Sequence, residues 1–189
     1  MLSKMEVCIP GPTRTADMGK RMDIRHLTLF SVLGTMMFAG KMVMAHIPNV
    51  EPVSLLVMLL AVCCGWRGLY AVAVYVLLEI LVWGVNLWAL SYLYVWALLF
   101  VAARLLWRME SSLSWGLLSG FFGLGFGALC AVPYWLTGGW AAAVSWWISG
   151  IPWDLVHGIG NFVMAVFLFK PLRKALTRLC KSVGLGIQA

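Results

Sequence analysis

Charged residues are scarce in this chain: Asp, Glu, Lys and Arg make up 11% of its 189 residues, whereas 62% are hydrophobic. Soluble proteins carry ~25% charged and ~45–50% apolar residues. A composition so poor in charge excludes a soluble enzyme, an extended disordered chain and a nucleic-acid-binding module. The apolar segments also leave no room for an ATPase domain within these residues, so work driven by ATP has to come from a partner.

The motifs of common catalytic, metal and nucleotide sites are missing as well. The five cysteines form no Cys-x-x-Cys, and no His lies at metal-ligand spacing from a Cys. Gly-x-Ser-x-Gly, His-Glu-x-x-His and the Walker A motif are absent. The glycines at 120, 123, 125 and 127 lie in an apolar run with no strand before them, so they predict close helix packing rather than a dinucleotide site. The pairs 116/120 and 123/127 are each four residues apart, which lets a neighbouring backbone approach. We therefore expect no catalytic residue, metal or cofactor in the chain.

Long apolar runs are what the sequence does contain. They fall at 27–45, 53–64, 69–85, 88–106, 115–136 and 151–169. A membrane-spanning helix needs ~20 mostly apolar residues, and the second run is short enough to be re-entrant. If all six runs cross and the N-terminal end is inside, 13 of the 14 Lys and Arg lie on the inner side, and only Lys41 lies within a span. By the positive-inside rule, this asymmetry predicts six spans with both ends cytoplasmic.

The sequence accordingly predicts an all-α integral membrane protein that forms a six-transmembrane-helix bundle. Residues 1–26 carry five basic and three acidic residues and no apolar core, so we interpret them as a polar cytoplasmic extension rather than a secretory signal. Residues 27–170 form the membrane domain, and residues 171–189 form a basic cytoplasmic tail.

Tryptophan gathers toward the predicted outer side. Eight of the 11 Trp lie in or near the outer half, at positions 83, 88, 96, 135, 140, 146, 147 and 153. An interfacial aromatic belt explains part of this, but a belt decorates both faces of a membrane. The sequence leaves two interpretations: a belt alone, or a belt combined with an aromatic-lined pocket that faces the outside.

Polar side chains inside the apolar runs are the main candidates for a site, because such groups are costly in lipid and face a cavity or the bundle. Lys41 and Glu79 both lie toward the outer side, where they form either an ion pair or ligand contacts. Asp154, His157 and Asn161 are spaced i, i+3 and i+7, which places them on one helix face that should look inward. They either contact substrate or form a structural polar cluster. Pro152 suits the first turn of this helix, whose positive end would then point at the outer cavity.

Small residues recur at every fourth position in the first run, at Ser31, Thr35 and Ala39. Such a stripe lets another helix approach closely. Its spacing does not say whether that helix is internal or belongs to another subunit.

The chain resembles the substrate-binding S components of energy-coupling factor (ECF) transporters. The resemblance rests on Gly150-Ile-Pro-Trp-Asp-Leu-Val-His-Gly-Ile-Gly-Asn161 ahead of Lys170-Pro-Leu-Arg, on Pro48-Asn-Val-Glu-Pro-Val53, and on Phe122-Gly-Leu-Gly-Phe-Gly. It covers roughly residues 27–175. Ser31 and Thr35 stand where the family often has alanines.

The resemblance implies a protein that captures a vitamin or related micronutrient from outside a prokaryotic plasma membrane. It would deliver the solute inward together with a coupling membrane subunit and two ATPase subunits. It implies that Asn49 and Glu51 belong to a lid after the first span and that the small-residue stripe contacts the coupling subunit. The outer ends of the last three spans would line the site, and the full set of expected substrate-binding residues is Lys41, Asn49, Glu51, Glu79, Tyr92, Trp96, Trp135, Trp146, Trp147, Asp154, His157 and Asn161.

Two other functions stay open at this point. One is a membrane-embedded enzyme that uses His157 with Asp154, and the other is a ligand-free membrane assembly protein. The substrate is constrained only by the Trp and Tyr faces and by outer acids that outnumber Lys41. These features favour a flat heteroaromatic vitamin that is neutral or cationic, such as thiamine or a pyrimidine-like precursor. Cobalamin, riboflavin, folate and a queuosine precursor stay open.

Overall fold

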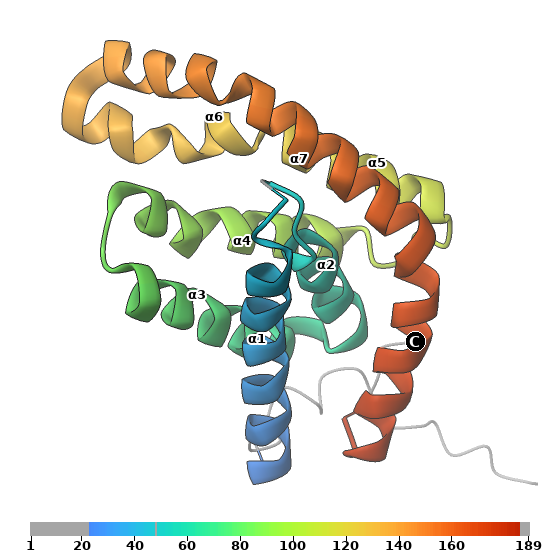
Figure 1. Ribbon diagram of the computed structural model, residues 1–189. Coiled ribbons are helices and arrows are strands. Elements are labelled where there is room, and N and C mark those ends of the chain that lie inside the picture. Colours follow the sequence, from blue (N-terminus) through green and yellow to red (C-terminus); the bar gives the residue numbers. More distant parts are fainter. Residues whose placement is uncertain (1–22, 48, 186–189) are drawn as a thin grey trace, which may run out of the picture.

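The computed structural model describes residues 23–47 and 49–185, and this part of the chain is all helical (Figure 1). Its helices are α1 (Ile24–Met44), α2 (Val53–Cys63), the 3-10 turn η1 (Gly65–Gly68), α3 (Leu69–Trp83), α4 (Leu87–Leu105), α5 (Ser112–Leu124), α6 (Phe126–Cys130) and α7 (Val132–Ser182). Four segments are long and apolar enough to span a membrane: 24–44, 65–83, 87–105 and 132–182. The prediction of an all-α chain with several candidate spans is confirmed.

Helix α2 lies in the interior of the fold. It has 11 residues, and all of them except Leu56 are buried. A helix that is apolar on every side needs neighbours on every side, and α2 packs against α1, α4 and α7. At 1.5 Å per residue it is ~16 Å long, about half the ~30 Å hydrocarbon core of a bilayer. The second run therefore forms a short buried helix rather than a full-length span.

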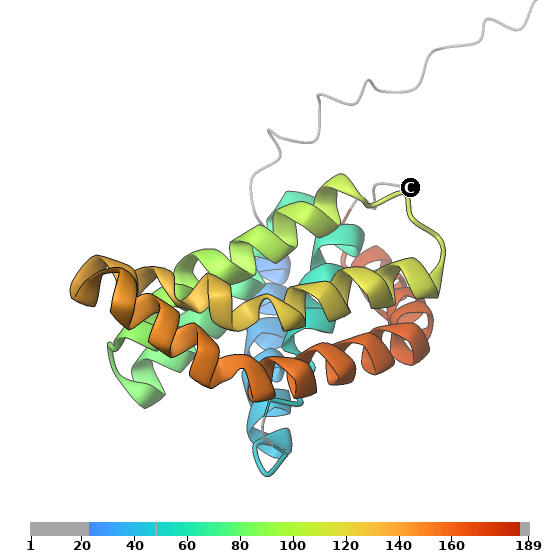
Figure 2. The ribbon, with the colours of Figure 1, turned by 90° about the horizontal axis from the view of Figure 1, so that it is seen from above.

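Residues 112–182 form a long helical hairpin. Its first arm is α5, then α6, then the start of α7, interrupted at Gly125. The chain reverses at Gly139, which has φ 73° and ψ −173°, and the rest of α7 returns beside α5 (Figures 1 and 2). Glycine suits this reversal because positive φ carries no Cβ penalty there.

The hairpin overturns two sequence-based expectations. The predicted apolar runs leave residues 137–150 outside the spans, yet they are helical on both sides of Gly139, and Pro152 lies inside α7. A proline within a membrane helix is tolerated because neighbouring groups satisfy the freed carbonyl. No helix begins at Pro152, so the predicted positive helix end facing the cavity is wrong.

The two arms pack through glycines, as the sequence predicted. A Cβ on Gly116 would collide with Val166, and one on Gly123 would lie 2.8 Å from the Cα of Gly158. The backbones of α5 and α7 therefore approach each other more closely than side chains would allow.

Helix α1 runs across the direction shared by α4, α5 and the middle of α7, as both views show. It crosses α3 at Gly34, where a Cβ would meet the Ala71 carbonyl oxygen at 2.6 Å. Helix α1 and the hairpin therefore cannot both cross one bilayer along its normal, and at least one of them is tilted from that normal.

The predicted domain limits differ from the helix ends. Residues 1–22 of the expected N-terminal extension lie outside the described residues, and α1 already begins at Ile24. Helix α7 continues through the expected C-terminal tail to Ser182. The Nε2 atom of His26 lies 3.2 Å from the Val183 carbonyl oxygen, which joins the start of α1 to the end of α7.

Candidate functional site

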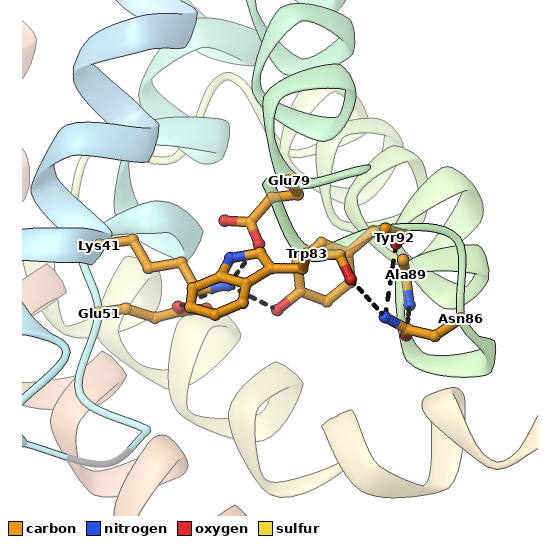
Figure 3. Close-up of polar contacts among 8 residues, drawn as sticks. Lys41, Glu51, Glu79, Trp83, Asn86, Ala89 and Tyr92 are labelled. Carbon is orange, nitrogen blue, oxygen red and sulfur yellow. Dashed lines mark hydrogen bonds and ion pairs between the residues drawn. The ribbon is translucent and has the colours of Figure 1, made fainter. Parts of the chain in front are cut away.

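The centre of the candidate site is an ammonium group held by acids from two segments. Lys41 Nζ lies 2.9 Å from Glu79 Oε2 on α3 and 3.9 Å from Glu51 Oε2 in the connection between α1 and α2. It also donates to the Tyr92 hydroxyl on α4 at 3.2 Å. Figure 3 shows Lys41 and Glu51 reaching from one side toward Glu79 and Tyr92. The ion pair that the sequence left open is therefore formed.

Two aromatic faces complete the surroundings of this ammonium. Lys41 Nζ lies 4.7 Å from the ring centroid of Trp88 and 5.0 Å from that of Tyr92. Both distances are within the ~6 Å over which a cation is attracted to an aromatic face. Trp88 and Tyr92 are four residues apart on α4, so one face of this helix presents both rings.

These rings belong to a larger aromatic cluster. Its members contact one another with centroids 4.6–6.2 Å apart, and they are Tyr75, Trp88, Tyr92, Trp96, Phe122, Phe126 and His157. Trp96 is fully buried among them. It therefore supports the rings beneath the charged group, and it does not line a cavity as the sequence had suggested.

The turn between α3 and α4 positions the entrance to this cluster. Gly84 has φ 76°, and the Asn86 side-chain oxygen caps α4 by accepting the Ala89 N–H at 2.8 Å. An Asn cap satisfies one of the free amides at a helix start. The turn thereby fixes Trp83 at the end of α3 and Trp88 at the start of α4, and both line the cavity described next.

Two cavities adjoin at this place. The first has a volume of about 280 Å³ and is lined by Lys41, Tyr92 and His157, together with residues 45, 47 and 49–51 of the connection between α1 and α2. The second has a volume of about 560 Å³ and lies toward the hairpin, lined among others by Trp146, Trp153 and Asp154. Asn49, Trp88 and Phe126 line both. One acid lines each cavity, Glu51 the first and Asp154 the second.

The connection between α1 and α2 forms one wall of both cavities. Asn49 adopts φ 57°, a left-handed conformation that Asn tolerates better than most residues. Val50 packs over Gly160 of α7, where an added Cβ would lie 3.4 Å away. Asn49 and Glu51 therefore lie beside the cavities.

Burial changes the acidity of Glu51. It raises the pKa of this carboxyl from 4.5 to about 7, the nearby Lys41 ammonium opposes that rise, and the Glu79 carboxylate adds to it. Loss of water around a carboxylate disfavours its charged form. The charge of Glu51 therefore changes near neutral pH.

The polar face of α7 looks inward, as its spacing predicted. Asp154, His157 and Asn161 are 5%, 2% and 1% exposed. Their surroundings differ, however. Asn161 donates to Ser54 Oγ at 2.9 Å and to the Ser119 carbonyl at 3.4 Å, so it joins α7 to α2 and α5. For Asn161, the observed contacts are those of a structural polar residue.

Asp154 and His157 line the two cavities separately. Asp154 accepts the Gly127 N–H and lies in the wall of the second cavity. His157 packs against Phe126 with ring centroids 4.7 Å apart and lines the first cavity. Within the described residues, no hydrogen bond joins Asp154 to His157, and the Nε2 atom of His157 has no partner. The orienting contact that an enzyme site built on this pair needs is therefore not formed.

Two of the expected tryptophans lie elsewhere. Trp135 and Trp147 line an apolar groove of about 270 Å³ between α6 and the two arms of the hairpin tip. Their side chains are about half exposed, at 52% and 44%. Trp146 instead stacks on Tyr134 with centroids 4.0 Å apart and lines the second cavity. The structure therefore does not bring the three tryptophans together in one cavity.

Sequence reasoning also missed several cavity residues. Trp88, Phe126 and Trp153 line the cavities but were not among the expected ligand contacts. The i, i+4, i+8 spacing of Trp88, Tyr92 and Trp96 could have revealed the aromatic face of α4. No comparable signal marked Phe126, which depends on the break between α5 and α6.

The small-residue stripe of α1 faces outward. Ser31, Thr35 and Ala39 are all exposed, on the side away from the α3 contact at Gly34. The Thr35 hydroxyl donates to the Ser31 carbonyl at 2.9 Å, so it needs no outside partner. The stripe is thus not used for packing within the described part of the chain.

No metal site accompanies these features: within residues 23–47 and 49–185, no three His, Cys, Asp or Glu side chains form a group suited to a metal ion. Comparisons with known proteins add no relative, since no family model, curated protein or solved structure matches the chain.

Proposed function

We propose that this chain is the substrate-binding subunit of an ECF-type importer, which captures a vitamin-like micronutrient from outside a prokaryotic plasma membrane. In this proposal, six segments cross the membrane, both ends are cytoplasmic, and a coupling membrane subunit with two ATPase subunits drives delivery inward. The sequence motifs around Pro48 and Gly150 support the family assignment.

The observation that carries the proposal is the paired cavity beside Lys41. It lies between the connection Ala45–Glu51, α4, α6 and α7, and it combines aromatic faces with a few polar groups. Small-molecule sites are typically apolar cavities of ~300–1,000 Å³ with a small number of placed polar groups. The aromatic walls favour a flat heteroaromatic molecule that is neutral or cationic.

The six-span arrangement rests on the distribution of basic residues and on the hairpin. From Ser112 to Gly138 the first arm contains 27 residues in α5, α6 and the start of α7. At 1.5 Å per residue this arm reaches ~40 Å, which is enough to cross a bilayer despite its interruption. The short α2 needs a locally thin crossing or tilted neighbours, which membrane proteins accommodate.

Co-purification from the native host tests the importer directly. A tagged chain extracted in mild detergent should bring down a second membrane protein and two ATPases. Ala39→Leu should reduce this recovery at least fivefold without changing thermal stability, because Ala39 is exposed. Ala73→Leu, at an exposed alanine on α3, is the matched control and should not reduce it.

Two other outcomes would replace the proposal. A protein that is recovered alone and converts a lipid substrate, with loss of turnover in His157→Ala, would show a membrane-embedded enzyme. A stable complex with a protein that is not an ATPase, without binding of any vitamin, would show an assembly protein.

A further inference from the structure

Lys41 occupies a place built for a cation. Its ammonium lies between two carboxylates, against one phenol hydroxyl and over two ring faces. Acids and aromatic faces in this combination are the usual means by which proteins bind ammonium ligands. The difference here is that the cation comes from the chain itself, at the end of a flexible side chain.

An anionic ligand would fit this place poorly. The Lys41 N–H groups already face Glu79, Tyr92 and Glu51, and two carboxylates would repel a ligand carboxylate. One lysine against two glutamates also leaves the group acidic when all three are ionised. A ligand cation therefore meets attraction that an anion does not.

Neighbouring groups are left for a ligand to use. Within the described part of the chain, Glu79 Oε1 and His157 Nε2 are buried and have no hydrogen-bond partner. Glu79 is completely buried, and His157 is 2% exposed and lines the same cavity as Lys41. Buried polar atoms rarely lack a hydrogen-bond partner in folded proteins, so these two atoms indicate contacts that a bound molecule would make.

Lys41 also borders the open cavity. Its side chain is 17% exposed, whereas that of Glu79 is fully buried. The lysine therefore reaches the acids from the cavity side and has open space to withdraw into.

We propose that Lys41 holds the place of a substrate cation, and that a flat aromatic cation takes this place between Glu79, Glu51 and the Trp88 and Tyr92 faces while the lysine withdraws. This inference rests on the proposed function, because it names the charge of the substrate that the same cavity takes.

Three pyridines of matched shape test the charge preference: N1-methylnicotinamide (cation), nicotinamide (neutral) and nicotinate (anion). Calorimetric titration of the purified full chain in detergent should show the cation binding at least tenfold more tightly than nicotinamide, with no binding of nicotinate. In Lys41→Met the cation should bind at least threefold more tightly than in the wild type, because its internal competitor is gone. In Glu79→Gln it should bind at least tenfold more weakly, and Glu110→Gln, at an exposed acid in the connection between α4 and α5, should leave it unchanged.

Three results would overturn the inference: nicotinate binding best, weaker binding of the cation to Lys41→Met, or no binding of the cation to that variant. If Lys41→Met does not fold, the wild-type order decides, together with Lys41→Met/Glu79→Gln. That double variant carries neither charge and should lose most of the preference for the cation over nicotinamide. An unchanged preference would count against the proposal.

The outcome is separable from the proposed function. Recovery of the ATPases together with tightest binding of a neutral or anionic vitamin would leave the importer standing and remove this inference. The expected order of the three pyridines, found without recovery of any ATPase, would support this inference and count against the importer.

Discussion

Both oxygens of the Asp154 carboxylate accept the same backbone N–H, that of Gly127, at 3.0 and 3.1 Å. The contact joins the returning arm of the hairpin to the first turn of α6, directly after the break at Gly125. A Cβ on residue 127 would overlap the carboxylate. Glycine at this position therefore lets an acid from α7 lie against the backbone in the wall of the second cavity.

Gly127→Ala should destabilise the protein by about 1–3 kcal/mol, the usual cost of forcing an extra methyl group into a packed site. Thermal unfolding in detergent measures this. Gly150→Ala is the matched control, since nothing lies within 4 Å of an added Cβ there, and alanine favours the helix by up to ~1 kcal/mol. Equal stability of Gly127→Ala and the wild type would contradict the observed packing.

The Lys41–Glu79 pair should show strong coupling in a double-mutant cycle. Lys41→Met leaves the fully buried Glu79 without its counter-charge, and breaking a buried pair in this way costs about 3–5 kcal/mol. The double variant Lys41→Met/Glu79→Gln removes both charges and should be more stable than Lys41→Met alone. Unfolding free energies in detergent give the coupling, and additive losses would mean that the two side chains do not interact.

Stability should fall as the pH rises from about 4.5 to 7, through Glu51. The folded-state pKa of this carboxyl is raised to about 7 from an ordinary 4.5, so in this window the folded protein keeps a proton that the unfolded chain has lost. One pKa unit corresponds to 1.36 kcal/mol, so the contribution lost by pH 8 is about 3 kcal/mol. Below pH 4.5 both states are protonated and the dependence ends.

Glu51→Gln is the variant that isolates this effect. Lys41, Tyr92 and His157 line the same cavity as Glu51, and Glu79 contacts Lys41; all four side chains are unchanged in this variant. The difference in melting temperature between the wild type and Glu51→Gln should therefore grow between pH 4.5 and 7. A difference that does not change with pH would show that Glu51 keeps an ordinary pKa.

Labelling from outside the cell should decide whether α2 crosses the membrane. Single cysteines at Ile47, Trp66, Val85 and Glu110, all exposed, are introduced after the native cysteines are replaced. An impermeant maleimide should label positions 47 and 85 in intact cells, and 66 and 110 only after lysis. Labelling of 47 and 66 from the same side would show that α2 does not cross, and the six-span arrangement would be wrong.

Local features of the sequence determined much of the fold. The first four apolar runs predicted helices whose ends lie within three residues of those observed, because a backbone in an apolar environment must satisfy its own hydrogen bonds. Spacing predicted which face of α7 looks inward, and the glycine series predicted the close contact of α5 with α7. These features depend on residues within a few turns of each other, so periodicity reports them.

Only the tertiary structure decided which distant groups meet. Lys41 and Glu79 are 38 residues apart, and Asp154 and Gly127 are 27 apart. No spacing rule relates such positions, because their distance depends on how α1 crosses α3 and how the hairpin folds back. That the returning helix already starts after Gly139, rather than at Pro152, was hidden for a related reason. The residues between them are almost uniformly apolar, and hydropathy does not distinguish a continuing helix from a turn there.

The tryptophans show the same division. The sequence determined that they gather toward one end of the molecule, since their positions follow from the apolar runs. The fold decided that Trp88 lies over Lys41, that Trp96 is buried beneath it, and that Trp135 faces a separate groove. An indole has the same hydrophobicity in all three places, so only the packing of the helices could assign each one its role.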